Sequence, residues 1–318
     1  MTNESMNNDN KPEWSIAIHG GAGTIPRDSL SAEKERETHL VLQKALNDGA
    51  DILKAGGSAM EAVVAAVVVM EDSPLFNAGK GSVFNHEGKH EMDAALIDGN
   101  GRHTGAVTGL LAVKNPIRLC KEIIQSSEHV MLSGAGAEEF ARKHGFEKMP
   151  AEYFFDQFRY DQWQSVKGTT KSMLDHTNEK KFGTVGAVAK DKNQHLAAAT
   201  STGGMTNKMY GRIGDTPVPG AGTWADDITC AVSCTGHGEF FMRYVAAYDV
   251  ACLMEYKMMS LQEAVTTVVH EKLGKSGGEG GLVAVDASGA IVMDFNCDGM
   301  YRGRASSVSD LYTAIYKE

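Results

Sequence analysis

The chain has 318 residues, of which 42% are hydrophobic and 23% are charged, so it can bury a substantial core as one large domain or two intimate halves. Its net charge of −10 argues against nucleic acid or an anionic membrane as a main partner, because both attract concentrated lysine and arginine. The acidity does not specify a ligand.

The first expected elements are a polar leader and a short strand. Residues 1–13 predict a disordered leader, and residues 1–10 have neither the basic region nor the apolar core of a signal peptide. Residues 14–19 alternate enough to form a strand, and the glycines at 20–23 predict a tight turn. The segment HGGAG (19–23) lacks the glycine spacing and the lysine of nucleotide-binding loops, so a turn is favoured over a phosphate site.

Two helical patterns follow. Between residues 31 and 55 apolar side chains recur at roughly helical spacing, and the glycines at 56–57 end the pattern. Ser58 and Glu61 form the signature of a capping box, which predicts a second helix running to about residue 71. That helix is apolar almost all round, so we expect it to be buried, although its apolar run is too short to cross a bilayer.

The middle of the chain changes character at about residue 147. Before that point the sequence predicts a loop at 74–81, several short strands between 82 and 113, and helices near 116–126 and 135–144. From 147 to 182 it is polar and aromatic with no sustained period. This stretch predicts a long, poorly packed connector, which is unusual inside a compact domain.

After Gly183 ordered elements resume. The expected elements are a hairpin from 184–190 and 196–201, a glycine-rich loop at 203–222, a helix near 239–255, a further helix that begins at a second capping box (Ser260 and Glu263), and a hairpin from 281–285 and 290–295. Helices thus lie between two sets of mainly antiparallel strands. This order predicts a layered α+β protein rather than a nucleotide-binding βαβ repeat.

Isolated polar residues indicate little chemistry. The five cysteines are odd in number and lack zinc-ligand spacing, so we expect reduced, mostly buried thiols and a cytoplasmic protein. The histidines without a partner, interpreted as ordinary surface or core residues, are His129, His144, His176 and His195. Asp226 and Asp227 are adjacent, and adjacent side chains on an extended chain point apart.

Thr184 is the candidate that remains, at the end of the connector. A hydroxyl needs a nearby base to become a nucleophile, and the chain has no GxSxG motif. A threonine at the start of a chain carries its own base, since an α-amine titrates at roughly 7.7–8.0 in model peptides. Thr184 would gain that amine only if the bond after Gly183 were cut. The alternative is an ordinary strand start, because threonine favours strands and glycine ends loops.

Six segments in order show a resemblance that runs from about Ile16 to near Arg302. They are IHGGAG (18–23), PLFNAGKGSVF (74–84), GTVGAVA (183–189), STGGMTNK (201–208), GRIGDTPVPGAG (211–222) and SCTGHGE (233–239). The chain resembles the plant-type asparaginase/isoaspartyl peptidase family of N-terminal-threonine hydrolases. The resemblance implies a four-layer αββα sandwich, the Ntn-hydrolase fold.

The resemblance also implies self-cleavage between Gly183 and Thr184. Residues 1–183 would form an α-subunit, folded over 13–150 with a flexible connector at 150–183, and residues 184–318 would form a β-subunit. Together they would make one structural domain. Two such pairs would assemble as an (αβ)2 heterotetramer.

Catalytic and substrate-binding roles carry over residue by residue. Thr184 would be the nucleophile with its own amine as base, Thr202 would hydrogen-bond around it, and Asn77 would orient nearby groups. Thr235 and Gly236 would form an oxyanion hole just ahead of the expected helix. The residues implied to hold the free aspartyl end of the substrate are Arg212 for the carboxylate, Asp215 for the ammonium, and Gly238 through its backbone.

Without the resemblance these residues have ordinary interpretations. Thr202 would be a hydroxyl that satisfies the backbone at the end of a strand. Arg212 and Asp215 would form a surface salt bridge worth about 0–1 kcal/mol.

The family resemblance further implies a structural sodium ion held mainly by backbone carbonyls. The matching positions are Met70, Glu71, Ser73, Phe76, Ala78 and Lys80. Carbonyl oxygens suit a hard cation. The chemistry itself would need no metal or organic cofactor.

The implied substrates are small molecules, namely β-aspartyl dipeptides and L-asparagine. Glycosylasparaginase is a rival interpretation, because it shares the nucleophile and has a similar TGHGE stretch, but HGGAG stands here where that group has a tryptophan-containing segment. A threonine endopeptidase of the same superfamily is a second rival, disfavoured by the compact Arg212/Asp215 pair. The third is an uncleaved, non-catalytic amino-acid-binding protein.

Overall fold

A computed structural model describes residues 11–23, 25, 30–169, 172 and 183–317 of the protein. Most of the leader expected at 1–13 lies outside the described residues. The same is true of 170–171 and 173–182 in the expected connector, and of His176 within it.

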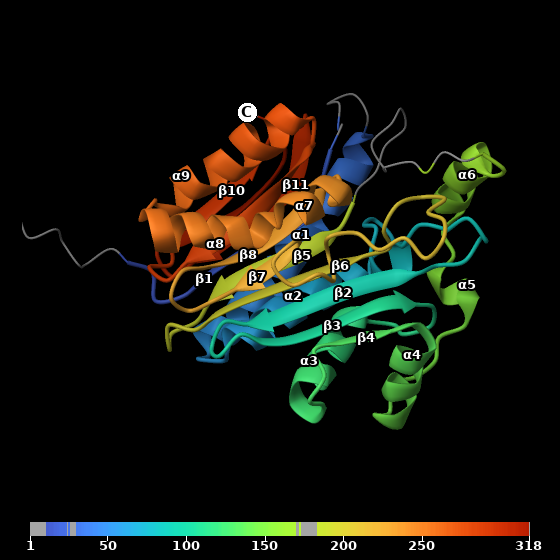
Figure 1. Ribbon diagram of the computed structural model, residues 1–318, viewed down its shortest axis with the longest axis horizontal. Helices are drawn as coiled ribbons and strands as arrows, with labels where there is room; N and C mark the ends of the chain where they lie inside the picture. The colour runs from blue at the N-terminus through green and yellow to red at the C-terminus, as the bar shows by residue number, and fades with distance from the viewer. Residues whose placement is uncertain (1–10, 24, 26–29, 170–171, 173–182, 318) are drawn as a thin grey trace, which may run out of the picture.

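Two β-sheets face each other between layers of helices (Figure 1). The large sheet has eight strands in the order β12-β11-β1-β5-β6-β2-β3-β4, and the small sheet has four in the order β10-β9-β8-β7. In the large sheet the strands are β1 Ser15–Gly23, β2 Met92–Asp98, β3 His103–Leu110, β4 Met131–Ser133, β5 Val185–Lys190, β6 Leu196–Thr202, β11 Gly299–Ser306 and β12 Ser309–Tyr316. In the small sheet they are β7 Thr223–Ala225, β8 Cys230–Gly236, β9 Gly280–Asp286 and β10 Ile291–Phe295.

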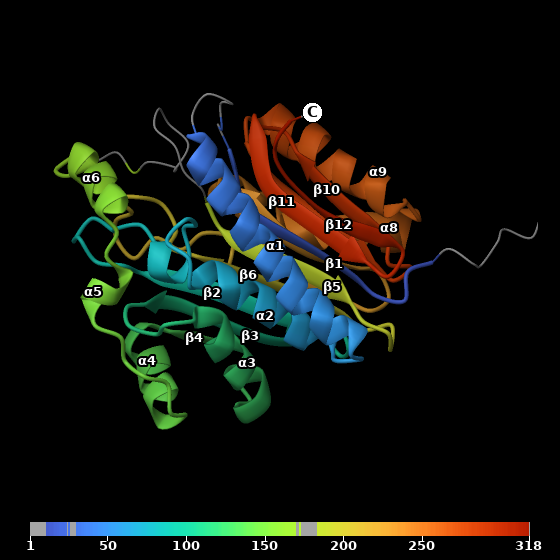
Figure 2. The same ribbon diagram turned by 180° about the vertical axis from the view of Figure 1, so that it is seen from behind.

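Each sheet has helices on its outer face. Figure 2 shows α1 and α2 across the large sheet, and Figure 1 shows α8 and α9 over the small one. On the large-sheet side the helices are α1 Ala32–Lys54, α2 Ala59–Glu71, α3 Pro116–Ser126, α4 Gly134–Lys143, α5 Ala151–Phe154 and α6 Gln157–Val166. On the small-sheet side they are α7 Gly238–Tyr244, α8 Ala246–Lys257 and α9 Leu261–Thr266, which continues as a π-helical turn (Thr267–Leu273) and a 3-10 turn (Gly274–Ser276). The four-layer αββα sandwich is confirmed.

The core follows the alternation of the strands. In β1, Ile16 and Ile18 pack with α1 and α2, whereas Ala17 between them packs in a separate cluster with residues of the small sheet such as Val283. Successive residues of a strand point to opposite faces, so one strand contributes to two layers. A third cluster, around Val250, fills the space between the small sheet and its helices.

The helix starts predicted from serine caps are confirmed. Ser58 and Glu61 form the complete capping box of α2, and Ser260 and Glu263 form that of α9. The side chain of Ser31 caps α1 by accepting a hydrogen bond from the backbone N–H of Lys34. The buried character expected of α2 is also confirmed, since most of its residues are shielded from solvent.

The glycines after His19 do not form the predicted turn. β1 runs on to Gly23, with a register shift between His19 and Ala22 against β11. Gly21 has a φ of 111°, a conformation that glycine adopts without steric cost. The turn prediction is wrong because the neighbouring strand keeps the segment extended.

The first half of the expected connector is folded. α5 and α6 occupy 151–166, and Trp163 is 6% exposed and stacks on Phe84 with ring centroids 5.7 Å apart. The Nε of buried Arg159 donates to the carbonyl of Gly81 at 3.1 Å. The prediction of a poorly packed, flexible segment is therefore wrong for these residues.

One further prediction is wrong, and two strands were not predicted. The single helix expected near 239–255 is two helices, because Val245 adopts a left-handed conformation with φ of 48° between α7 and α8. β11 and β12, which complete one side of the large sheet, were not predicted from the sequence.

The two expected hairpins, β5–β6 and β9–β10, are confirmed. No helix within the described part of the chain is both long and apolar enough to cross a bilayer.

Candidate active site

Thr184 lies immediately before β5, beside the end of β6. It is 8% exposed, and its Oγ1 donates a hydrogen bond to Oγ1 of Thr202 at 3.2 Å. Thr202 ends β6 and also accepts from the backbone N–H of Gly204 at 3.0 Å. The hydroxyl of Thr202 therefore contacts both the local backbone and Thr184, and its role in the chemistry stays a prediction.

Asn77 fastens the turn that follows β6. Its Nδ2 donates to the carbonyl of Gly204 at 2.7 Å, and its Oδ1 accepts from the N–H of Val83 at 3.0 Å. Its own carbonyl accepts from the N–H of Gly203 at 3.0 Å. Asn77 thus supports Thr202 through the neighbouring backbone and has its described hydrogen bonds there.

Most of the expected site residues line one small cavity of about 30 Å³. The lining residues are Gly183, Thr184, Thr202, Gly204, Met205, Arg212, Gly214, Asp215, Thr216 and Gly236. Gly183 and Thr184 are both lining residues, so the bond between them lies at the wall of this cavity. Larger hollows lie elsewhere, such as one of about 470 Å³ beside Phe84 and Tyr160, and contain none of these residues.

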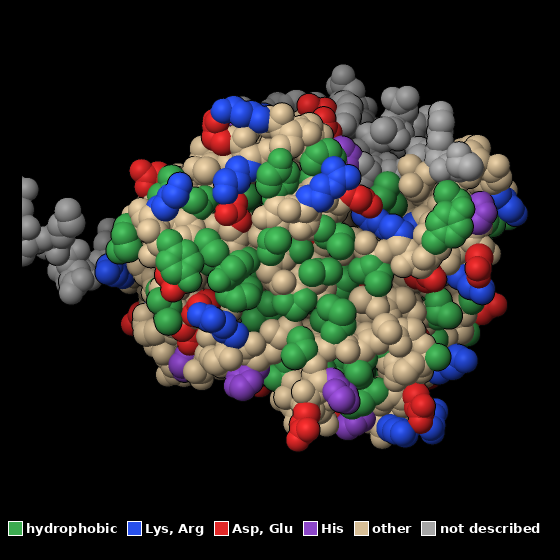
Figure 3. Space-filling view, in the orientation of Figure 1, with side chains coloured by type: hydrophobic (Ala, Val, Ile, Leu, Met, Phe, Trp, Pro, Cys, Tyr) green, Lys and Arg blue, Asp and Glu red, His purple; other side chains and the backbone are tan. Residues whose placement is uncertain are grey.

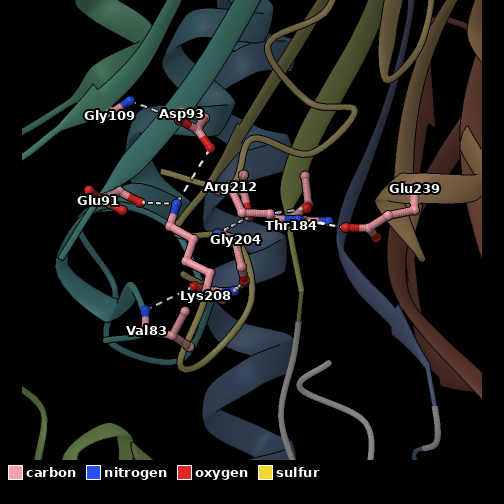
Figure 4. Close-up of polar contacts among 11 residues, drawn as sticks. Val83, Glu91, Asp93, Gly109, Thr184, Gly204, Lys208, Arg212 and Glu239 are labelled. Atoms are coloured by element: carbon pink, nitrogen blue, oxygen red, sulfur yellow. Dashed lines mark hydrogen bonds and ion pairs between the residues drawn. The ribbon is translucent and has the colours of Figure 1, made fainter. Parts of the chain in front are cut away.

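Arg212 and Asp215 lie in the same cavity wall. The Nε of Arg212 donates to Oε1 of Glu239 at 2.7 Å, which Figure 4 shows beside Thr184. Asp215 is 4% exposed, and its Oδ2 has no hydrogen-bond partner among the described residues. Burial raises the pKa of Asp215 to about 7, against the opposing effect of the Arg212 charge.

Gly238 leaves space for the side chains of both Arg212 and Asp215. A Cβ added there would lie 2.7 Å from Oδ1 of Asp215 and 2.9 Å from Nη2 of Arg212. The carboxylate and the guanidinium therefore converge over the Cα of one glycine, where a side chain would collide with both. This is a pair of opposite charges at one wall of the site, not an exposed surface salt bridge.

The proposed oxyanion residues end β8. Thr235 is 0% exposed, and its Oγ1 is buried without a hydrogen-bond partner in the described part of the chain. A buried hydroxyl left in this way costs free energy unless a ligand uses it. Gly236 lines the cavity and has a φ of 142°, and a Cβ there would lie 2.4 Å from the carbonyl of Glu279. α7 begins two residues later and is short, so Thr235 is the stronger argument.

A buried ion pair between Lys208 and Asp93 lies next to the site. Nζ of Lys208 lies 3.6 Å from Oδ2 of Asp93 and donates to the carbonyl of Glu91 at 2.8 Å (Figure 4). Asp93 stands opposite Thr202 in the β2–β6 ladder, and Gly204 packs against the Lys208 side chain. Burial raises the pKa of Asp93, while the Lys208 charge opposes that shift.

Sequence reasoning missed the roles of three residues at this site. They are Glu239, which binds Arg212, Lys208, which lies beneath Gly204, and His19, whose Nδ1 lies 3.1 Å from the carbonyl of Thr184. All three stand inside the segments that carry the family resemblance. Their presence there was a signal, but their partners come from distant parts of the chain.

The backbone of the expected sodium loop is closely packed. A Cβ on Gly79 would lie 2.4 Å from the carbonyl of Glu71, and one on Gly81 would lie 2.1 Å from that of Phe76. The Nζ of Lys80 lies 5.7 Å from the ring centroid of Tyr153, so its side chain is engaged away from the backbone. Backbone carbonyls are the ligand type that suits a hard cation, whereas no group of His, Cys, Asp and Glu in the described residues could hold a metal.

Several of the remaining polar residues form ordinary pairs away from this cavity. His195 pairs with Asp227 at 2.7 Å and His144 with Glu122 at 2.8 Å. Asp226 binds Arg102 instead, so the two adjacent aspartates do point to different partners.

Comparison with known proteins gives consistent matches over nearly the whole chain. A family model described as Asparaginase matches residues 12–315. Proteins named isoaspartyl peptidase are similar, at 46% identity over 308 residues, both in Salmonella typhimurium (95% of this chain and 98% of that protein) and in Escherichia coli strain K12 (95% and 96%). A zebrafish (Danio rerio) protein named isoaspartyl peptidase/L-asparaginase is 39% identical over 281 residues, 88% of each chain.

Proposed function

The chain belongs to the asparaginase family, and we propose that it is an isoaspartyl peptidase and L-asparaginase whose nucleophile is Thr184. One observation carries this proposal: Thr184, Thr202 and the oppositely charged pair of Arg212 and Asp215 line one cavity together with Gly183. The names of the relatives agree with it. The enzyme would be an amidohydrolase of the N-terminal-nucleophile class.

Self-cleavage would create the active form. The Oγ of Thr184 attacks the carbonyl carbon of Gly183, and the amide nitrogen of Thr184 leaves and takes up a proton. Water then hydrolyses the resulting ester, which leaves a carboxylate on Gly183 and a free amine on Thr184. The contact from Thr184 to Thr202 supports this step, because it orients the hydroxyl in the uncut chain.

In turnover the same hydroxyl would attack the side-chain amide of the substrate. The α-amine of Thr184 accepts the hydroxyl proton and delivers it to the leaving nitrogen. Thr235 and the N–H of Gly236 hold the negative oxygen of the tetrahedral intermediate, a role that the unpartnered hydroxyl of Thr235 supports. Water then releases aspartate from the ester.

Arg212 and Asp215 would select the free aspartyl end. The guanidinium binds the α-carboxylate, and the carboxylate of Asp215 binds the α-ammonium. Glu239 holds Nε of Arg212 and so leaves its terminal nitrogens directed to the site. A substrate in the middle of a polypeptide lacks both charges, which disfavours an endopeptidase.

A sodium ion would have a structural role in the loop after α2. Its ligands would be backbone carbonyls from the set Met70, Glu71, Ser73, Phe76, Ala78 and Lys80. The proposal rests on the family resemblance and on the preference of such a cation for carbonyl oxygens. No step of the hydrolysis needs a cofactor.

The assembly would be an (αβ)2 heterotetramer in the cytoplasm. Figure 3 shows hydrophobic side chains gathered over the face that carries α7 and α8, and Met242, Tyr244 and Val245 are exposed there. An apolar patch of this kind suits contact with a second copy. All five cysteines are free thiols, which supports a reducing compartment.

A substrate panel tests the function. Turnover of β-aspartyl-leucine and L-asparagine is expected, and a preference for a glycosylated asparagine would favour the glycosylasparaginase alternative. Arg212→Ala should mature normally yet raise KM by about 10–100-fold, since it removes a charge-assisted contact to the carboxylate. An unchanged KM would remove Arg212 from substrate binding, and absence of turnover with an intact chain would favour the non-catalytic binder.

A further inference from the structure

His19 is a buried group that the mechanism above does not use. It stands in β1 of the large sheet and is 0% exposed. Its Nδ1 lies 3.1 Å from the carbonyl oxygen of Thr184, and its Nε2 lies 2.8 Å from Oγ of Ser233 in the small sheet. The imidazole therefore bridges the two sheets at the residue that would act as nucleophile.

The Thr184 carbonyl decides which nitrogen of the ring carries the proton. A carbonyl oxygen only accepts, so Nδ1 must be the donor. Burial lowers the pKa of His19 to about 3, so the ring is neutral and has one proton. Nε2 must then accept a hydrogen bond, and Ser233 must donate it.

This choice orders a chain of hydroxyl groups behind the histidine. Ser233 donates to His19, so in its 2.7 Å contact with Thr200 it accepts, and Thr200 in turn accepts from Thr223 at 2.6 Å. All three hydroxyl residues are 0% exposed. The chain runs in one direction, from Thr223 through both sheets to the carbonyl of Thr184.

Gly186 makes room for this contact. A Cβ at that position would lie 1.9 Å from Oγ of Ser233 and 2.4 Å from Nε2 of His19. A glycine is needed at position 186 because His19 and Ser233 come close to its Cα, and not because the chain turns there.

We propose that His19 is a positioning residue for Thr184, which it holds through a single neutral tautomer fixed by Ser233, Thr200 and Thr223. The hydrogen bond fixes the peptide plane after Thr184 and hence the directions of its hydroxyl and amine. This inference rests on the proposed role of Thr184 as nucleophile. Misplacement of a reacting group by about 1 Å can cost about 10²-fold in rate.

Two substitutions separate positioning from packing. The amide nitrogen of asparagine falls near the Nδ1 position of histidine, so His19→Asn keeps the donor to Thr184. Glutamine places its amide near Nε2, so His19→Gln keeps the contact with Ser233 and loses that donor. Both variants are smaller than histidine, which makes each a control for the other.

Turnover is measured per mole of free Thr184 amine, so that incomplete maturation does not affect the result. We expect His19→Gln to lower kcat by about 10–100-fold and His19→Asn to retain at least about ten times more kcat than His19→Gln. KM should change by less than about threefold in both, because the contacts of Arg212 and Asp215 are untouched. Equal kcat in the two variants, or a higher value in His19→Gln, would overturn the proposal.

The tautomer gives a second measurement that needs no variant to remain active. In a long-range nitrogen–proton correlation spectrum of histidine-labelled enzyme, an unprotonated ring nitrogen resonates far downfield of a protonated one. His19, assigned by its loss in His19→Asn or His19→Gln, should show protonated Nδ1 and bare Nε2. Protonated Nε2 would overturn the proposal, because Ser233 would then donate to the carbonyl of Ala199, 3.3 Å away.

Different results would contradict the proposed function and the positioning role of His19. A wild-type protein that leaves β-aspartyl-leucine and asparagine intact would contradict the proposed function. An active wild type with equal His19→Asn and His19→Gln variants would contradict the positioning role alone.

Discussion

At the scale of single residues, the hydroxyl of Thr184 has no side-chain base among its hydrogen-bond partners in the described part of the chain. Its described hydrogen-bond partner is the hydroxyl of Thr202, which is not a base at ordinary pH. His19 is close, but its Nδ1 faces the Thr184 carbonyl and its pKa is lowered to about 3 by burial. This arrangement would leave the α-amine, which the proposed cleavage would free, as the group that can accept the proton.

Thr235 tests the oxyanion site. Thr235→Val removes the hydroxyl and keeps the shape, so kcat should fall by about 10²–10³-fold with little change in KM. The control is Thr235→Ser, which keeps the hydroxyl and should stay within about tenfold of wild type. Steady-state kinetics on β-aspartyl-leucine decide the matter. If Thr235→Val turned over at the wild-type rate, its hydroxyl would have no part in the chemistry.

The buried carboxyl of Asp215 should give kcat/KM an unusual pH dependence. Its pKa is raised to about 7 by burial, so in the free enzyme it becomes neutral as the pH falls through that value. The substrate ammonium then loses its partner, while the α-amine, with a pKa of roughly 7.7–8.0 in model peptides, also gains a proton. Two protonations lower kcat/KM, whereas in the bound complex the substrate ammonium keeps Asp215 ionised.

The measurement is a pair of pH profiles between about pH 8 and pH 5.5. On the acid side log(kcat/KM) should fall with a slope approaching two and log(kcat) with a slope of one. KM should therefore rise as the pH falls. A flat KM over this range, with a slope of one in both profiles, would show that Asp215 does not bind the ammonium in its charged form.

At the scale of elements, α6 is the least expected part of the fold. Trp163 is its buried anchor, and Phe155, which precedes the helix, is 47% exposed. Trp163→Ala should lower the free energy of unfolding by about 3 kcal/mol, because it removes a buried aromatic side chain. Phe155→Ala is the matched control and should cost under about 1 kcal/mol.

Denaturant unfolding in a Thr184→Ala background, which keeps one chain, measures both costs. Limited proteolysis adds a local readout, since cleavage within 151–166 should be faster in Trp163→Ala alone. Equal losses in the free energy of unfolding for the two substitutions would show that α6 is not anchored by Trp163 and that this segment is the loose connector its composition suggests.

Elements whose signals are local could be predicted from the sequence. The serine caps of α1, α2 and α9 and the hairpin β5–β6 depend on a few adjacent residues. β11 could not be predicted in this way, because Gly299 and Gly303 disfavour a strand and its place depends on β1 and β12. The break at Val245 is similar, since a β-branched residue rarely adopts positive φ and nothing local signals it.

At the scale of the whole molecule, the sandwich brings residues from distant segments to one cavity. Thr184 immediately precedes β5 and Thr202 ends the neighbouring strand β6 of the large sheet, and Gly236 comes from the small sheet. The family segments identified these positions, but the sequence could not show which groups support them. The contact of Glu239 with Arg212 and that of His19 with Ser233 join residues 27 and 214 positions apart, so only the folded chain reveals them.

Cleavage of the bond before Thr184 is the central claim, and N-terminal sequencing of the purified, active protein tests it most directly. We expect a second chain that starts Thr-Val-Gly-Ala in amounts that track activity, and a single uncut, inactive chain in Thr184→Ala. An active preparation that contains only full-length chain, or a Thr184→Ala protein that is still cut at this bond, would contradict the claim.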